Sequence, residues 1–380
     1  MDRKNTDRIR IGILTFHRAH NYGALFQAYA LLSFLKKYFP ETEIIDYWPL
    51  YHQDEYKLIP NWKRRTFVEK IKGILVFLIG FQQIVKRRRG YLNFMKEYLR
   101  LPDKVRFPFA GSLTDSYYDV VIYGSDQIWR KMHFNNQHFF DDVYWGYYPH
   151  NVGVRIAYAA SMGDVNLTPD DLPYINQSLQ NFRHIGIREH YLIDMLRQIR
   201  DVEFQQVVDP VFLLDKQHWD DLICNLTYKT PSEKYILFYH LTYSTNALQF
   251  VNKLSEATGY RIIEIRGRVI PYLIGKRYFH GISPLQFLLL IKNSEMVVTN
   301  SFHGTAFSIM FEKDFYSVIK SVENNRIRSL LNMLKLTNRI IDSDRSMLPD
   351  EPINYSEVKA ILLHYIQNSK QFILKAIQSQ

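Results

Sequence analysis

The feature that most constrains the fold is a repeated alternation of strand-like and helix-like segments. Short apolar runs are followed by longer stretches whose apolar positions recur at helical spacing, as Leu25, Ala28, Leu32 and Leu35 do. We predict strands at Ile9–Phe16, Glu43–Tyr47, Tyr118–Tyr123, Val154–Ala160, Arg183–Ile187, Gln206–Val208, Tyr235–Tyr239, Arg261–Ile265, Met296–Thr299 and Phe315–Ile319. We predict helices at Ala24–Tyr38, Lys216–Leu226, Asn246–Thr258, Leu285–Ile291, Ala306–Phe311, Arg326–Leu334 and Ser356–Ile377, and one that opens near Pro169.

The alternation falls into two halves. The polar stretch Tyr228–Glu233, which contains Pro231, reads as a linker, and the β–α units restart after it. We expect an α/β fold of two doubly wound, Rossmann-like domains that face each other across a cleft. Their predicted ranges are 1–228, with an insertion at 61–106, and 234–345, followed by a helix over 355–380.

Composition excludes several classes of protein. Cys224 is the single cysteine of the 380 residues, so an internal disulfide and a cysteine metal cluster are both excluded. No spacing of His, Asp and Glu suggests metal ligands, so we expect no metal. Residues 1–10 are polar and no apolar run approaches the roughly 20 residues of a bilayer span, so we expect a cytoplasmic protein without a signal peptide.

The net charge of +10 comes from one segment. Residues 61–106 hold thirteen Lys and Arg against three Asp and Glu, and the rest of the chain carries 35 of each. We expect no nucleic-acid partner, because such proteins usually spread basic residues over a groove. Within Lys70–Arg89, an apolar stretch at Ile74–Phe81 is flanked by basic residues. This segment, helped by basic residues after Trp62, suits the surface of an anionic membrane; the alternative is a helical hairpin docked on its own domain.

A turn at Ser301–Thr305 follows the predicted strand Met296–Thr299 and precedes a helix. The carboxyl end of a strand that feeds a helix is where α/β folds bind ligands, and free N–H groups at the helix start attract anions. With His303 inside it, the turn suits a phosphate or carboxylate and offers a proton donor. The alternative is that His303 only caps the helix and Gly304 only permits the turn.

Two N-terminal segments also follow predicted strands. His17 and Asn21–Ala24 come after the first strand, where Gly23 allows close approach, although a plain capped turn explains them equally well. Gly124–Trp129 comes after the third, and Asp126 there is placed to accept a proton from a hydroxyl or to cap a helix. Trp129 either stacks on a sugar ring or belongs to the core.

Two further motifs lie between these segments and the linker. Arg188 stands at a strand end and either binds a carboxylate or phosphate or pairs with Glu189 on the surface. Asp209-Pro210 reads as a structural turn before a helix.

Taken together, the segments NYGALFQAYAL, YGSDQIW, IREH, DPVFLL and SFHGTAFSIMF resemble the polysaccharide pyruvyl transferase family over about Ile11–Leu336. The resemblance implies a GT-B-like fold and transfer of the enolpyruvyl unit of phosphoenolpyruvate to a sugar of a surface-polysaccharide precursor. A pyruvate ketal would form and phosphate would leave. The implied partners are phosphoenolpyruvate as donor substrate and a lipid-linked or nucleotide-linked sugar, without any cofactor.

The resemblance also implies roles for residues. It makes His303, Asp126 and Arg188 the catalytic candidates, with His303 as general acid or phosphate ligand and Asp126 as base. It places the donor at Arg188, Ser301, His303, Gly304 and Thr305, and the acceptor at His17, Asn21, Tyr22, Gly23, Ser125, Asp126, Gln127 and Trp129.

Some positions depart from the family pattern. Asn is frequent where this chain has Arg130, so we expect a different acceptor preference if Arg130 adds a charge to the acceptor site. In the family, Leu is frequent at the position of Phe26 in this chain, and Lys-Pro-Phe is frequent at the position of Lys313-Asp314-Phe315. Two other functions stay open: a GT-B glycosyltransferase that uses a nucleotide sugar, and a non-catalytic assembly factor of the same fold. The sequence leaves the oligomeric state, the acceptor sugar and the ketal stereochemistry open.

Overall fold

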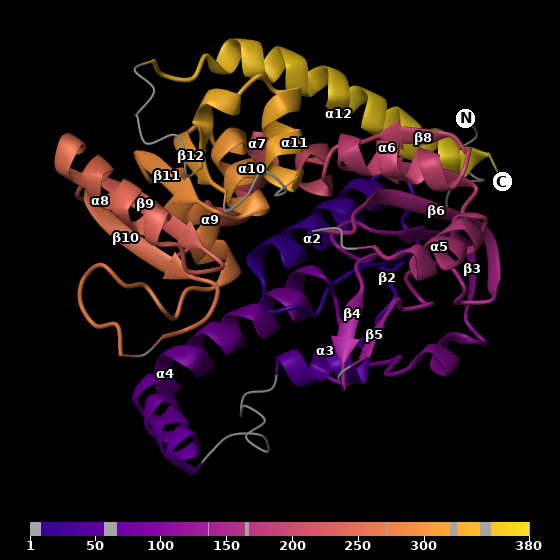
Figure 1. Ribbon diagram of the computed structural model, residues 1–380, viewed down its shortest axis with the longest axis horizontal. Coiled ribbons are helices and arrows are strands. Elements are labelled where there is room, and N and C mark those ends of the chain that lie inside the picture. The colour runs from indigo at the N-terminus through magenta and orange to yellow at the C-terminus, as the bar shows by residue number, and fades with distance from the viewer. Residues whose placement is uncertain are drawn as a thin grey trace.

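The fold is built on two parallel sheets, one in each half of the chain (Figure 1). The computed structural model describes residues 9–56, 67–135, 137–163, 167–270, 272–319, 325–342 and 351–379. The expected α/β class, with two parallel sheets flanked by helices, is confirmed. All strands of the first sheet precede residue 207, and all strands of the second follow residue 234.

The first sheet has six strands in the order β2-β1-β3-β6-β7-β8, all parallel. Their bounds are β1 Ile11–Leu14, β2 Thr42–Ile44, β3 Tyr117–Tyr123, β6 Asn151–Ala160, β7 His184–Ile187 and β8 Phe204–Gln206. The chain extends the sheet to one side of β1 and then to the other. The topological switch point therefore lies between β1 and β3.

The second sheet repeats this pattern with five strands in the order β10-β9-β11-β12-β13, again all parallel. Their bounds are β9 Tyr235–His240, β10 Arg261–Arg266, β11 Met296–Thr299, β12 Asp314–Val318 and β13 Ile340–Ile341. The switch point here lies between β9 and β11. A separate antiparallel hairpin, which the periodicity does not predict, joins β4 Met132–Phe134 to β5 Gln137–Phe139.

Helices connect these strands. Their bounds are α2 Tyr22–Lys36, α3 Leu50–Glu55, α4 Phe67–Tyr98, α5 Leu172–Leu179, α6 His190–Ile199, α7 Lys216–Ile223, α8 Thr245–Thr258, α9 Pro284–Lys292, α10 Phe302–Met310, α11 Asn325–Met333 and α12 Tyr355–Gln378. Short 3-10 turns lie at η1 Ala110–Leu113, η2 Pro169–Asp171, η3 Pro210–Leu213 and η4 Thr337–Arg339. None of the helices within the described ranges combines the length and the apolar character that a membrane crossing needs.

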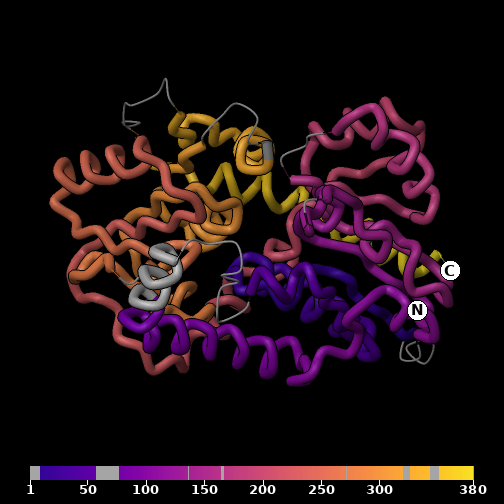
Figure 2. Tube along the Cα trace, turned by 60° about the horizontal axis from the view of Figure 1, so that its bottom comes forward, coloured from indigo at the N-terminus to yellow at the C-terminus, as the bar shows by residue number. Residues whose placement is uncertain are grey.

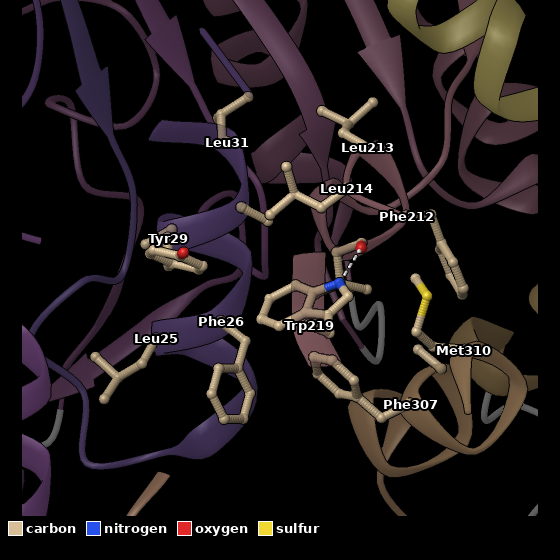
Figure 3. Packing of buried hydrophobic residues seen from close by; sticks show 14 of the residues in the cluster. Leu25, Phe26, Tyr29, Leu31, Phe212, Leu213, Leu214, Trp219, Phe307 and Met310 are labelled. Atoms are coloured by element: carbon tan, nitrogen blue, oxygen red, sulfur yellow. Dashed lines mark hydrogen bonds between the residues drawn. The ribbon is translucent and has the colours of Figure 1, made fainter. Parts of the chain in front are cut away.

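One continuous core joins the two halves. Figure 3 shows Trp219 of α7 between Phe26 of α2 and Phe307 of α10, with ring centroids 5.8 Å and 4.9 Å away. Both pairs are edge-to-face, which is a favourable geometry for aromatic rings. The indole N–H of Trp219 donates to the carbonyl of Val211 at 3.2 Å, so this fully buried side chain leaves no polar atom unsatisfied. The helix starts that border the site are therefore held by shared packing.

Two long helices run along the molecule and contact both halves (Figures 1 and 2). The segment expected to be a membrane-surface stretch or a hairpin is a single helix, α4, which packs on α2 and α9. Gly90 allows this contact, because a Cβ there would lie 2.6 Å from Cβ of Ser283. The α12 helix leaves the second half and ends on the first, where Ser369 accepts a hydrogen bond from Val208 N at 2.9 Å.

Candidate active site

The switch points of both sheets lie at one pocket of about 190 Å³. The loops that follow β1, β3, β9 and β11 all reach it, and these are the strands whose carboxyl ends form the crevices of doubly wound sheets. Residues from both halves line it, including Phe16, His17, Arg18, Asn21, Asp126, Gln127, Arg130, Leu241, Ser301, Phe302, His303 and Arg326. The topology thus explains why side chains nearly 300 positions apart meet here.

Two helices begin at the pocket, one from each half. Asn21 caps α2 by accepting from Gly23 N at 2.9 Å, and Ser301 caps α10 by accepting from Gly304 N at 3.3 Å. Both capping residues line the pocket. Each helix start carries a partial positive charge, so an anion in this pocket is attracted from two directions.

His303 stands in the first turn of α10 and packs against the first turn of α2. Its side chain is only 8% exposed. A Cβ on Gly23 would lie 2.0 Å from Nδ1 of His303 and 2.3 Å from its Cγ, far inside van der Waals contact. Only glycine fits at position 23, and its backbone fixes the imidazole from the opposite half of the molecule.

Behind His303 lies a fully buried carboxylate, Asp209. Its Oδ2 is 3.5 Å from Nε2 of His303, 2.7 Å from Nη1 of Arg188 and 3.3 Å from Oγ of Ser125. Arg188 also donates from Nε to Glu189 at 2.7 Å, and its guanidinium lies 4.4 Å from the ring centroid of Phe302. Asp209 therefore connects His303 to a buried network in the other half.

The charge state of Asp209 follows from these contacts. Burial alone would raise the pKa of its carboxyl, but interactions with His303 and then Arg188 outweigh burial, so the pKa lies well below its usual range. The distance of 3.5 Å to His303 is long for a hydrogen bond, as catalytic contacts often are before substrate binds. An anionic Asp209 places an acceptor 3.5 Å from Nε2 of His303, a buried nitrogen that makes no hydrogen bond with the described residues.

Asp126 follows β3 and lines the pocket half-buried. Its backbone has φ +73°, and one carboxyl oxygen accepts from Gln127 N at 2.9 Å, so the loop fixes its direction. The neighbouring Gln127 approaches Arg326 of α11: with its amide oxygen turned toward the guanidinium, it accepts at 2.8 Å from Nη2. This pair bridges the two halves at the edge of the pocket.

His17 lines the pocket, but its ring nitrogens are both engaged. Nδ1 lies 2.8 Å from the carbonyl of Thr15, and Nε2 lies 3.0 Å from Asp46. Arg18 binds the same carboxylate with two nitrogens. Burial opposes the charge of Asp46, but the hydrogen bonds from Arg18 and His17 lower its pKa to about 2. We therefore reassign His17 from an acceptor ligand to the wall that shapes the pocket.

Four other predicted acceptor residues lie outside the pocket lining, and one of them is Gly23, which packs against His303. Trp129 is fully buried and stacked on Trp145 at 4.7 Å, so its ring belongs to the core and cannot stack on a sugar here. Tyr22 donates its hydroxyl to the carbonyl of Ile282 and is also buried. Ser125 is buried and donates to the carbonyl of Ala159 at 3.1 Å.

Three predicted donor residues also lie behind the pocket surface. Gly304 packs on Thr299, where a Cβ would meet Oγ1 at 2.4 Å. Thr305 is fully buried and shares a hydrogen bond of 2.7 Å with Ser317. Arg188 is buried, pairs with Glu189 and Asp209 and packs on Phe302, so it lies behind the pocket lining and not in it.

The structure also adds residues that the sequence motifs did not single out as ligands. Asp209, read as part of a turn, contacts His303, and Arg18, His52, Tyr56 and Arg326 line the pocket. Arg18 and Asp209 offered a signal, because each comes soon after a predicted strand; nothing local marked the other three. Within the described ranges, no group of three or more His, Cys, Asp or Glu side chains is placed to hold a metal ion.

A sequence model of polysaccharide pyruvyl transferases matches residues 21–319, most of the chain. The chain belongs to this family. The match includes both capping residues, Asp126, Asp209 and His303. Membership in a family of transferases agrees with a pocket on which two helix starts and ionisable side chains converge. A search of curated proteins finds no match.

The solved structures to which this family member is similar include two enzymes at low sequence identity. Escherichia coli heptosyltransferase WaaC with ADP is 13% identical with a TM-score of 0.39, and the match covers 95% of this chain and 100% of that one. The wall teichoic acid polymerase TagF is 12% identical with a TM-score of 0.39, and the match covers 97% of this chain and 86% of that one.

Proposed function

We propose that the protein transfers the pyruvyl group of phosphoenolpyruvate to a sugar of a surface-polysaccharide precursor, forming a pyruvate ketal and releasing phosphate. One observation carries the proposal: in a chain of this family, two helix N-termini and His303 converge on one pocket. Phosphoenolpyruvate carries a phosphate and a carboxylate, and two convergent helix starts are suited to a ligand with two anionic groups.

The reaction needs a proton at the methylene carbon of the donor and removal of protons from two sugar hydroxyls. Protonation of that carbon leaves an oxocarbenium-like centre, which one hydroxyl attacks. The bond from this carbon to the phosphate oxygen then breaks, and the second hydroxyl closes the ketal. One hydroxyl proton replaces the proton given to the methylene carbon, and the other leaves with phosphate.

Three side chains would share these tasks. His303 would contact the donor phosphate and supply the proton, while Asp126 would accept the proton of the attacking hydroxyl. Asp209, itself held by Arg188, would keep the imidazole oriented and stabilise positive charge on it. Arg188 acts as a positioning residue in this scheme, because it reaches His303 only through Asp209.

Ligand binding and turnover test this proposal against transfer from a nucleotide sugar. Phosphoenolpyruvate should raise the unfolding temperature, whereas a nucleoside diphosphate should not. With phosphoenolpyruvate and candidate lipid-linked or nucleotide-linked sugars, phosphate should appear together with a product heavier by one pyruvate less one water. Protection by the diphosphate alone would favour the glycosyltransferase, and a folded protein that binds neither would favour an assembly factor.

His303→Ala tests the central residue. We expect this variant to lose transfer and to keep its fold, because the side chain lines the pocket. His190→Ala is the matched control, since His190 is exposed on α6 with only a 3.9 Å pair to Asp194. Full transfer by His303→Ala would contradict the assignment.

We also propose that α4 rests on an anionic membrane at its cytoplasmic face, where a lipid-linked acceptor would be found. Leu78, Ile79 and Phe81 are 63%, 65% and 44% exposed, so this end of α4 presents apolar side chains. Lys86 and Arg89 are exposed farther along the helix. The basic residues after Trp62 lie outside the described residues.

One predicted member of the basic flank has another role. Arg87 is buried, donates to the carbonyl of Arg266 at 2.8 Å and lies over the rings of Tyr22 and Tyr91. It therefore holds α4 to both halves and is not available to lipid.

Flotation with anionic vesicles tests the membrane proposal. Lys86→Gln with Arg89→Gln should lower recovery with the vesicles. Lys335→Gln with Lys359→Gln, an equal loss of exposed charge, should leave recovery unchanged. Equal recovery of all three proteins would refute the proposal.

A further inference from the structure

Arg130 is a pocket cation for which the described part of the chain offers no anionic partner. It lies two residues beyond the fully buried Ile128 and lines the pocket half-buried. Across the described ranges its guanidinium makes no hydrogen bond and no ion pair, only a cation–π contact with Phe16 at 5.5 Å. The nearby Arg18, by contrast, binds Asp46 with two nitrogens. An arginine kept partly out of water without a carboxylate suggests that a ligand supplies the anion.

The wall around Arg130 is aromatic. Phe16, Tyr47, Trp48, His52 and Tyr144 all line the pocket, and all belong to the first half of the chain. Burial, helped by the positive charge of Arg130, lowers the pKa of His52 to about 3, so this wall gains no charge from it at neutral pH. Aromatic faces suit the apolar face of a sugar ring, and a single polar group among them fixes orientation.

The acids of the pocket do not neutralise Arg130. Asp126 and Glu55 also line it, yet neither forms an ion pair with this guanidinium. The two helix starts and His303 already attract the anionic groups of the donor. Arg130 thus leaves one further positive charge on the wall that would hold the sugar.

We propose that Arg130 binds an anionic substituent of the acceptor, a carboxylate or a phosphate on or next to the sugar that receives the pyruvyl group. The planar guanidinium would bind either group through two parallel hydrogen bonds. This inference rests on the proposed function and narrows its substrate class from any sugar to a negatively charged one.

Calorimetric titration of the full chain tests the proposal. The ligands are a neutral methyl hexoside, the uronoside of the same sugar and the hexose 1-phosphate, with wild type, Arg130→Gln and Arg130→Lys. Wild type should bind one charged ligand about tenfold or more tightly than the neutral one, as charge-assisted bonds predict. Arg130→Gln should lose that preference and Arg130→Lys should keep part of it. The charged ligand that shows the preference distinguishes carboxylate from phosphate.

Three results would overturn the inference. One is a wild type that binds neither charged sugar more tightly than the neutral hexoside, and another is an Arg130→Gln variant that keeps the preference. The third comes from titrating phosphoenolpyruvate alone. If Arg130→Gln weakens the binding of phosphoenolpyruvate, Arg130 binds the donor and not the acceptor, and the proposed function still stands. If wild type binds no phosphoenolpyruvate, the proposed function fails, while the sugar titrations still decide the anion subsite.

Discussion

Gly23→Ala should reduce transfer sharply without unfolding the protein, because the new methyl group meets the imidazole of His303. A Cβ at position 23 would lie 2.0 Å from Nδ1, and real Cβ atoms essentially never come closer than 3.0 Å to a heavy atom outside their own stretch of chain. His303 or the start of α2 must therefore retreat by at least 1.0 Å, the difference between these distances. Misplacing a catalytic group by about 1 Å costs on the order of a hundredfold in rate.

The same substitution should change stability much less. Overpacking costs about 1–3 kcal/mol, while alanine in a helix gains up to about 1 kcal/mol over glycine. The net loss is then roughly 0–3 kcal/mol of unfolding free energy. Gly111→Ala is the matched control: its nearest contacts would be ring atoms of Phe109 at 3.5 and 3.6 Å, which is ordinary van der Waals distance.

Phosphate release from phosphoenolpyruvate and urea unfolding, measured for both variants, decide the matter. We expect about a hundredfold slower release for Gly23→Ala and wild-type behaviour for Gly111→Ala. Wild-type turnover by Gly23→Ala would refute the argument that the backbone of α2 positions His303. A variant that is slow only because it is unfolded would show this in the urea curve.

Three further predictions concern buried groups. Asp209→Asn should lower the free energy of unfolding in urea by about 3 kcal/mol, because the substitution leaves a buried cation without its anion. It should also slow phosphate release at least tenfold. No change in either quantity would contradict the role given to Asp209. His52 has a folded pKa of about 3 against an ordinary 6.5, so the unfolded chain binds more protons between these values and stability falls as pH falls. At pH 5 this effect lowers the free energy of unfolding by about 2 kcal/mol, and His52→Phe should remove that loss. At pH 8 the substitution should remove none, and urea unfolding at both pH values checks this. Arg87→Gln should cost about 2 kcal/mol and exposed Arg89→Gln almost nothing in the same assay; equal effects would show that Arg87 does not hold α4.

The position of the site could be predicted from the sequence because it depends on strand ends. Apolar runs of strand length mark parallel strands, and the carboxyl ends of parallel strands meet at one edge of a sheet. Asn21, Asp126 and His303 each follow such a run, and the structure brings all three to one pocket. The sequence also offered a capped turn at Asn21, which the structure shows, whereas the cap of α10 is Ser301 and not His303.

Which side chains face the pocket could not be predicted, because long-range packing decides it. Trp129 is adjacent to pocket residues in sequence, yet Trp145 stacks on it and withdraws it into the core. Asp209 sits at a turn whose local pattern is ordinary. Its importance comes from His303, 94 positions away and attached to the other sheet. The burial of Arg87 within a basic run likewise depends on rings and a carbonyl from distant segments.

The course of α12 has a consequence for how the protein is made. This helix covers the first half of the molecule: Phe372 packs against Gly186 of β7, and Ser369 caps the backbone of Val208. Translation delivers the first sheet early and α12 only after the second sheet, although domains usually fold as they emerge. Part of the apolar surface of the first sheet therefore stays uncovered during translation, until the whole second half has been synthesised. A chain truncated before α12 would contain every residue up to His303, yet its first sheet would remain partly uncovered and prone to aggregate.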